Sequence, residues 1–370
     1  MARPSAWWAR PPPGGLLVAR AGGQDGGGEG GEAGGGAGGG DGDPVLMFLA
    51  EEAGLGREGA LRAIDRYPPL RNYSVEERLA PTLLFLVQEA GLGQAGAAKA
   101  ITRRPKVLGI SVEQNLAPVA RYLAEDLGLG REGAAKLITT YPSVLGYSVD
   151  ENIAPQVRYL AENLGLGLAG AVKVITKFPQ VLGYSVEDNI APKVRYLAEE
   201  LALGRDGAAK VITGCPSVLG MSVEDNLAPK VRYLAEEAGA GREGAADIIL
   251  AYPSLLGFSI ERKLRPTLRF LSEHFPDTNA VKLVSLAHYN LAGRQVPRVR
   301  LLQKHGQAGR FAASSIAKFT PATFCEHVGI TMEEYDAEVA SCVREHVEIH
   351  PSLDAGSGSR AGSGARAGAG

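Results

Sequence analysis

Apolar and polar residues follow one another along most of this chain with the period of a helix. After Pro192 the apolar residues stand at positions i, i+3, i+4 and i+7, namely Val194, Leu197, Ala198 and Leu201. This spacing places them on one face of an α-helix. Residues do not alternate with a period of two over any useful length, so no strand is expected. The pattern therefore predicts an all-α protein.

A second, shorter helix is expected over residues 206–213, after a glycine turn that suits the end of the first helix. Pro216 ends this second helix, because proline cannot donate the backbone hydrogen bond that would continue it. Residues 216–220 then form a tight apolar turn. Ser222 begins a capping-box pattern, which predicts a short 3₁₀-like or capped turn before a kink at Pro229.

This unit returns every 37 residues. One proline of the unit recurs at Pro68, Pro105, Pro142, Pro179, Pro216 and Pro253, and the other at Pro81, Pro118, Pro155, Pro192, Pro229 and Pro266. The second series extends back to Pro44 and, with a shorter step of 31, forward to Pro297. A fixed period of this length is the signature of stacked helical repeats. The sequence predicts an α-solenoid of about seven to eight repeats, each with two α-helices and a short 3₁₀-like turn.

Glycine content divides the chain into three parts. The 49 glycines of the 370 residues concentrate in residues 22–43 and 355–370, where Gly, Ala and Ser tracts predict flexible coil. The first 24 residues contain three arginines and no acid, a composition typical of an organelle transit peptide. We therefore expect a targeting segment and linker over residues 1–43, a repeat domain over 44–350, and a tail over 351–370.

Basic residues recur along the repeats although the net charge is −2. One ladder lies three residues after the second proline and includes Arg158, Arg195 and Arg232, each with a glutamate four residues later. Another lies in the second helix and includes Lys99 and Lys173, which lack an acid four residues before them. Two interpretations stay open for both ladders: solvated helix surface with i, i+4 ion pairs, or contacts to a phosphate backbone.

The stretch 294–318 carries six positive charges in 25 residues and no acid. Phosphate contacts dominate nucleic-acid affinity, so this stretch is the clearest predicted phosphate-binding surface. It forms the C-terminal basic element of the repeat domain, at 290–318. Its basic residues are Arg294, Arg298, Arg300, Lys304, Arg310 and Lys318.

Other chemistry finds little support in the sequence. The three cysteines have no metal-site or disulfide spacing, and Cys215 takes a position that holds an aromatic residue in most other repeats, which predicts a core side chain. The glycine-rich segments lack the ending of a phosphate loop. No nucleophile with a base and no apolar 18-residue run is present. We expect a non-enzyme without metal, cofactor or membrane span.

The repeat itself resembles that of the mitochondrial transcription termination factor (mTERF) family. Its motif is Pro-x-x-Leu followed by Ser-x-x-x-x-Leu-x-Pro, a helix and a Leu-Gly turn. Residues 290–302, with Gly293-Arg294 and Pro297-Arg298, look like the C-terminal segment of that family. The resemblance covers about residues 44–340. It implies a curved solenoid superhelix that binds nucleic acid in mitochondria or chloroplasts.

Three functions follow as hypotheses. The first is binding of double-stranded DNA through its backbone to regulate organelle transcription or termination, because nearly identical middle repeats favour contacts that do not depend on sequence. The second is RNA binding in organelle intron splicing or ribosome assembly. The third is a protein-interaction scaffold, which the near-neutral charge suits. We expect a monomer, whose partners besides nucleic acid are organelle transcription or ribosome-assembly proteins.

Overall fold

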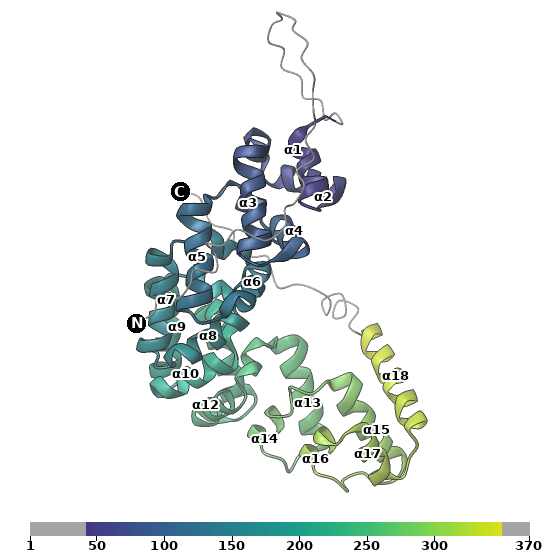
Figure 1. Ribbon diagram of the computed structural model, residues 1–370. Helices are drawn as coiled ribbons and strands as arrows, with labels where there is room; N and C mark the ends of the chain where they lie inside the picture. The colour runs from purple at the N-terminus through teal and green to yellow at the C-terminus, as the bar shows by residue number, and fades with distance from the viewer. Residues whose placement is uncertain (1–41, 350–370) are drawn as a thin grey trace, which may run out of the picture. The chain divides into compact units, whose positions relative to one another are not determined.

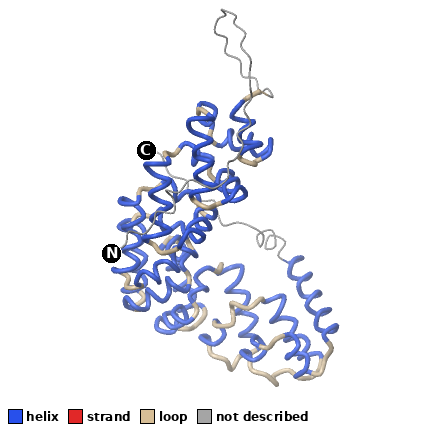
Figure 2. The backbone as a smooth tube through the Cα atoms, in the orientation of Figure 1, coloured by secondary structure: helices blue, strands red, loops and turns tan. Residues whose placement is uncertain are grey.

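The computed structural model describes residues 42–349, and every regular element within them is helical (Figures 1 and 2). This confirms the predicted all-α class. The chain separates into two compact units, Met1–Val186 and Glu187–Gly370. The predicted targeting segment, nearly all of the first glycine-rich tract and the predicted tail lie outside the described residues. The predicted curvature of the array stays a prediction.

The α-helices divide between the two units. Unit 1 contains α1 (Pro44–Met47), α2 (Gly56–Arg66), α3 (Ala80–Leu84), α4 (Gly93–Arg103), α5 (Ala117–Arg121), α6 (Gly130–Thr140), α7 (Ala154–Arg158) and α8 (Gly167–Lys177). Unit 2 contains α9 (Ala191–Arg195), α10 (Gly204–Gly214), α11 (Ala228–Arg232), α12 (Gly241–Ala251), α13 (Arg265–His274), α14 (Ala280–Val284), α15 (Val296–Lys304), α16 (Ala313–Lys318), α17 (Pro321–Val328) and α18 (Met332–Ile349).

Shorter helical turns join these helices. The 3₁₀ turns are Pro68–Asn72, Pro105–Gly109, Pro142–Gly146, Pro179–Gly183, Pro216–Gly220 and Pro253–Gly257. The π-helical turns are Phe48–Glu52, Val75–Leu79, Phe85–Glu89, Val112–Leu116, Tyr122–Asp126, Val149–Ile153, Tyr159–Asn163, Val186–Ile190, Tyr196–Glu200, Val223–Leu227, Tyr233–Glu237, Ile260–Leu264 and Leu291–Gln295.

A typical repeat therefore has a first helix, a second helix and a 3₁₀ turn. The first helix joins two π-helical turns and the α-helix between them, as over residues 112–126 around α5. The second helix is an α-helix of 11 residues such as α6, and the 3₁₀ turn follows it. This arrangement confirms the predicted unit of two helices and a 3₁₀ turn.

The 3₁₀ turn does not lie at the serine-capped segment, where a 3₁₀-like or capped turn was expected. The structure forms it at the Pro-x-x-Leu-Gly segment, whereas the serine-capped segment is a π-helical turn. Ser222 accepts a hydrogen bond from the backbone N–H of Asp225 at 3.0 Å, and its carbonyl accepts one from Leu227 at 3.1 Å. The carbonyl of Asp225, four residues before Pro229, lies in this wider turn. In a regular α-helix the proline ring would clash with that carbonyl.

The repeats pack on one another through equivalent elements. In unit 1, α4 contacts both α2 and α6, and the 3₁₀ turn Pro105–Gly109 contacts the turns before and after it. In unit 2, α12 contacts α10 and α14. Figure 1 shows α4 and α6 as neighbours in the stack. Within each unit, neighbouring second helices thus pack side by side, and in unit 1 the 3₁₀ turns that follow them do the same.

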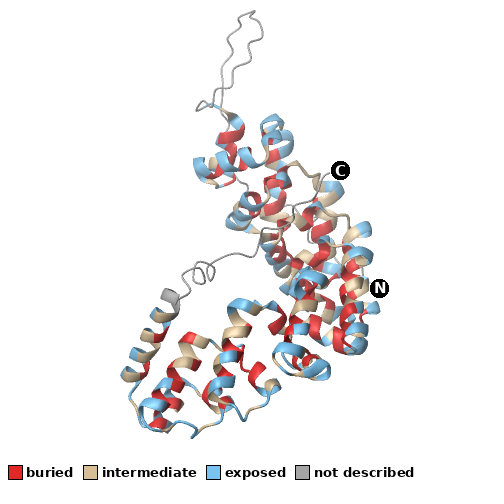
Figure 3. Ribbon diagram, turned by 180° about the vertical axis from the view of Figure 1, so that it is seen from behind, coloured by how far each residue is buried: buried red, intermediate tan, exposed pale blue. Residues whose placement is uncertain are grey.

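Buried residues occur along the helices and turns of both units (Figure 3). Val144 and Leu145 of one 3₁₀ turn are fully buried, as are their counterparts Val181 and Leu182. Cys215 is buried, which confirms its prediction as a core residue. A C-terminal core joins α15, α16, α17 and α18 in unit 2. Its buried residues are Leu301, Leu302, Ile316, Phe324, Cys325, Val328 and Tyr335.

Candidate nucleic-acid interface

Arg298 requires a correction, because it lies inside the C-terminal core. Its side chain is fully buried. Its Nη1 donates to the carbonyl of Ile316 at 2.5 Å and its Nε to the Tyr335 hydroxyl at 3.2 Å, and its guanidinium lies 5.1 Å from the centre of the Phe324 ring. Burial lowers the pKa of Arg298. A guanidinium in this position cannot reach a phosphate at the surface, so Arg298 is removed from the predicted contacts.

Arg300 is exposed but paired with acids of α18. Its Nη1 and Nη2 donate to the two carboxylate oxygens of Glu345 at 2.9 and 2.7 Å, and Glu338 lies 3.8 Å away. The hydrogen bonds to Glu345 raise the pKa of Arg300, and the same bonds lower the pKa of Glu345. A side chain predicted to meet phosphate therefore meets a carboxylate of its own chain.

Lys304 and its neighbour His305 share a third acid of α18. Lys304 Nζ donates to Glu334 Oε1 at 2.8 Å, and His305 Nε2 lies 2.9 Å from the same oxygen. The hydrogen bond to Glu334 raises the pKa of Lys304. The stretch 294–318 is acid-free in sequence, but acids from about 30 to 45 residues later neutralise its centre in the fold.

The remaining basic residues of this stretch differ in exposure. Arg294 is half-buried, donates to the carbonyl of Phe319 at 2.7 Å and lies over the Tyr289 ring. Arg310 is exposed and donates to Gln307 at 2.5 Å. Lys318 is exposed, and neither it nor Arg310 forms an ion pair with an acid within residues 42–349. The structure therefore leaves little open cationic surface at the C-terminal end.

The predicted arginine ladder is exposed on the first helices. Arg158, Arg195 and Arg232 each end an α-helix and face solvent. The i, i+4 pairing expected for this ladder forms at Arg269, whose Nε donates to Glu273 at 3.1 Å. Among the described residues, no such pair is formed by Arg195 with Glu199 or by Arg232 with Glu236. All three arginines are exposed at the surface.

The lysine ladder lies on the second helices, which stack on one another. Lys99 in α4, Lys136 in α6 and Lys173 in α8 are all exposed and stand 37 residues apart. All three belong to unit 1. Since α4 and α6 are in contact, the predicted Lys99 and the neighbouring Lys136 lie on one continuous layer.

The structure adds basic residues that the ladders did not include. Arg103 Nη1 donates to the carbonyls of Thr139 and Thr140 at 2.8 Å each, and Arg66 Nη1 donates to that of Thr102 at 2.9 Å. These guanidiniums connect the C-terminal end of one second helix to the next, where carbonyls and the helix dipole favour a cation. Lys106 is exposed in the following 3₁₀ turn. The sequence signal for this group is the acid-free window over residues 90–112.

Charge in unit 1 is separated between the two kinds of helix. Its second helices with their 3₁₀ turns, over residues 56–72, 93–109, 130–146 and 167–183, hold 12 basic and three acidic residues. We name this surface the second-helix layer. Its basic residues are Arg57, Arg62, Arg66, Arg71, Lys99, Arg103, Arg104, Lys106, Arg131, Lys136, Lys173 and Lys177, and its acids are Glu58, Asp65 and Glu132.

The first helices of the same unit have the opposite charge. Over residues 44–52, 75–89, 112–126 and 149–163 they hold three basic and 11 acidic residues. In unit 2 the second helices and turns over 204–220 and 241–257 hold three of each sign. The separation of charge therefore belongs to unit 1.

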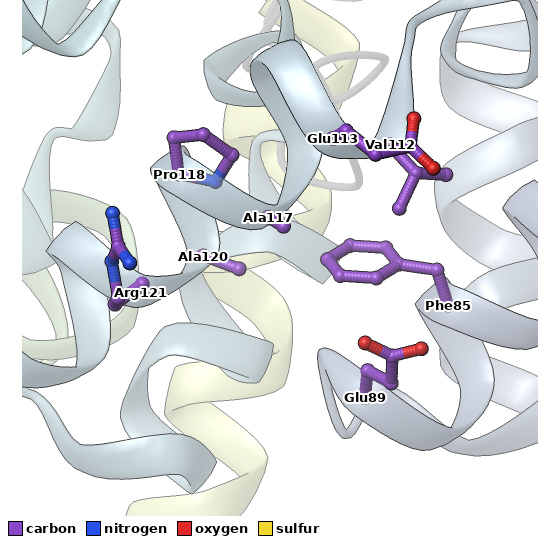
Figure 4. A pocket seen from close by; sticks show the side chains of 8 residues that line it. All are labelled: Phe85, Glu89, Val112, Glu113, Ala117, Pro118, Ala120 and Arg121. Carbon is purple, nitrogen blue, oxygen red and sulfur yellow. The ribbon is translucent and has the colours of Figure 1, made fainter. Parts of the chain in front are cut away.

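A pocket on the first helices of unit 1 differs in charge from the basic second-helix layer (Figure 4). It has a volume of about 360 Å³, and its lining includes Phe85, Val112, the carboxylates of Glu89 and Glu113, and the guanidinium of Arg121. Burial and then the nearby charge of Glu113 raise the pKa of Glu89. The two carboxylates outnumber the single guanidinium and repel phosphate, so a nucleic-acid backbone is not expected here.

The described residues contain neither a cluster of possible metal ligands nor a helix that could span a membrane. Within residues 42–349 no three His, Cys, Asp or Glu side chains gather closely enough to hold a metal ion. No helix in that range combines the length and apolar character needed to cross a bilayer.

Comparison with known proteins gives one family. The family model described as mTERF matches residues 41–324, which include every 37-residue repeat and end within α17. No curated protein sequence matches the chain significantly. Helix α18, which pairs with the basic residues of α15, lies beyond the matched segment.

Proposed function

Because the chain belongs to the mTERF family, whose members are non-catalytic nucleic-acid-binding proteins of organelles, we propose that it binds double-stranded DNA in a mitochondrion or chloroplast. It contacts the phosphate backbone and regulates transcription or its termination. The second-helix layer of unit 1 makes these contacts.

One observation carries this proposal: the 12 basic and three acidic residues of the second-helix layer. A chain with a net charge of −2 binds a polyanion only through a surface on which its basic residues collect. Equivalent lysines on stacked helices repeat that surface from one repeat to the next. Lysine and arginine contacts to phosphates carry no sequence information, which suits repeats that are nearly identical.

The exposed arginines of the first helices have a smaller part. Arg158 stands among 11 acidic residues of the first helices in unit 1, and these lower the positive potential around it. Lys99 and Lys173 stand among bases instead. We therefore place Lys99 and Lys173 at the interface, with the newly found Arg103 and Lys106 between them in the layer.

A salt titration tests the proposal. Binding of fluorescent duplex DNA, duplex RNA and single-stranded RNA is measured by anisotropy over a range of salt concentrations. We expect the logarithm of the DNA affinity to fall linearly with the logarithm of salt, with a slope of about −0.9 per phosphate contacted and several contacts in total. Tighter binding of either RNA at every salt concentration would favour the RNA hypothesis. Absence of binding to all three ligands would favour a protein scaffold.

A further inference from the structure

Helix α18 covers the basic side of α15 with a matched row of acids. Three carboxylates of α18, those of Glu334, Glu338 and Glu345, face α15. Their partners are Lys304 and His305 for the first, and Arg300 for the other two. Both helices belong to unit 2 and are in contact.

The carboxylate of Glu345 binds Arg300 in the way that a phosphate group could bind it. It receives both terminal nitrogens of Arg300 at 2.9 and 2.7 Å, in the two-pronged geometry that arginine also forms with phosphate oxygens. Ser341 Oγ donates to the same carboxylate at 3.3 Å and helps to hold it in place. At Glu334, one oxygen is shared by Lys304 Nζ and His305 Nε2.

These ion pairs can exchange partners without unfolding the helix. The Arg300 and Lys304 side chains remain 43% and 61% exposed, and exposed pairs contribute little to stability. Helix α18 is also held by Tyr335, which is buried in the C-terminal core, and by Val339, which packs against that core. Rotation of the glutamate side chains alone would therefore expose the basic side of α15 while α18 stays packed.

We propose that Arg300, Lys304 and His305 form a second phosphate-binding surface, and that α18 is a built-in polyanion with which nucleic acid competes for it. The proposal rests on the proposed function, since nucleic acid is the competing polyanion. It assigns α18, which follows the family-matched segment, the role of lowering affinity at the C-terminal end. The same contacts explain why the centre of a stretch so basic in sequence is paired with acids in the fold.

Two triple variants of the full chain separate this effect from a change in net charge. The uncovering variant carries Glu334→Gln, Glu338→Gln and Glu345→Gln. The control variant carries Glu326→Gln, Glu333→Gln and Asp336→Asn, three exposed acids of α17 and α18 that form no ion pair within the described residues. Both variants change the charge by the same amount. Affinity for a short mixed-sequence DNA duplex is measured by anisotropy at several salt concentrations.

We expect the uncovering variant to bind on the order of tenfold more tightly than the wild type, with a salt slope steeper by about two, because two or three further cations become available to phosphates. The control variant should change affinity much less and keep the wild-type slope. Equal changes in the two variants, or no change in either, would overturn the proposal.

The outcomes also separate this proposal from the proposed function. A wild type that binds duplex DNA, with an uncovering variant that binds no better, overturns the role of α18 alone. A wild type without affinity and an uncovering variant with affinity supports it. Thermal melts show whether each variant folds. If the triple variant does not fold, Glu334→Gln alone releases Lys304 and His305 and should produce a smaller gain of the same kind.

Discussion

One position of the repeat places polar side chains in the interior of the protein, where they cannot contact a ligand at the surface. The residue directly after the second proline is buried in every repeat in which it is polar: Thr82, Gln156, Lys193, Lys230, Thr267 and Arg298. Gln156 donates to the carbonyl of Tyr184 at 2.8 Å, and Lys230 to that of Leu256 at 2.6 Å, each in the following 3₁₀ region. Gln156 and Lys230 thus satisfy carbonyls of the following repeat.

The sequence therefore shows which repeat position Arg298 occupies, but it does not predict that the side chain is buried there. Arg298 follows Pro297 as Lys230 follows Pro229, but a basic residue is rarely buried, and its charge favoured a surface role. Only the packing of α15 against Phe324 and Tyr335 shows that this position faces the core. In contrast, the exposure of Arg195, two positions further along the helix than Lys193, agrees with a simple helical pattern.

Replacement of Lys230 by methionine tests this buried position through pH. Burial lowers the pKa of Lys230 from 10.5 in the folded protein, so the unfolded chain binds more protons between the two pKa values. Stability should therefore rise with pH across that interval in the wild type, and Lys230→Met should remove this contribution. The measurement is the urea midpoint at a series of pH values from neutral to about pH 10.

The matched control is Lys210→Met, at an exposed lysine of the same unit. Its pH dependence should remain parallel to that of the wild type. Parallel curves for Lys230→Met as well would contradict the assignment. A pH-independent loss of stability is also expected in Lys230→Met, because the carbonyl of Leu256 loses its donor.

At the scale of the element, periodicity predicted most of the repeat. Proline and glycine positions located the ends of the second helices and the turn after them, because both residues have strong local effects on the backbone. The π-helical turns at both ends of the first helices were not predicted. A turn with i→i+5 bonds has the same residue types as an α-helical turn, so single-sequence patterns do not distinguish them.

A glycine at the end of the 3₁₀ turns tests the packing of one repeat on the next. A Cβ at Gly183 would lie 2.3 Å from the hydroxyl of Tyr147, which is itself held by a 2.6 Å hydrogen bond to Tyr141. Gly183→Ala should therefore displace Tyr147 and cost about 1–3 kcal/mol. The change is measured by urea denaturation monitored by circular dichroism.

Gly146 provides a control at the same position of the preceding repeat. A Cβ there would meet its nearest atoms at 3.6 Å, an ordinary contact distance. Gly146→Ala should therefore be tolerated with a much smaller loss. Similar losses in both variants would show that the close approach of Tyr147 is not the cause.

At the scale of the whole molecule, net charge conceals how charge is distributed. Both units contain many acidic residues. In unit 1, however, the acidic residues lie mostly on the first helices and the basic residues mostly on the second-helix layer. This separation follows from sequence once the helices are assigned to layers. The neutralisation of α15 does not, because α18 supplies acids that are distant in sequence and reach Arg300 and Lys304 only in the folded unit.

The central claim is that the second-helix layer of unit 1 is the surface that binds nucleic acid. Its direct test compares two triple variants in duplex-DNA binding over a range of salt concentrations. The layer variant carries Lys99→Gln, Lys106→Gln and Lys173→Gln, all exposed residues of unit 1. The control variant carries Lys210→Gln, Arg262→Gln and Lys282→Gln, exposed residues of unit 2 with the same total charge.

We predict that the layer variant binds on the order of tenfold more weakly than the wild type, with a salt slope shallower by about two to three, because each lost phosphate contact removes about 0.9 from the slope. The control variant should retain most of the affinity and the slope. Equal losses in the two variants, or an unchanged affinity in the layer variant, would contradict the account.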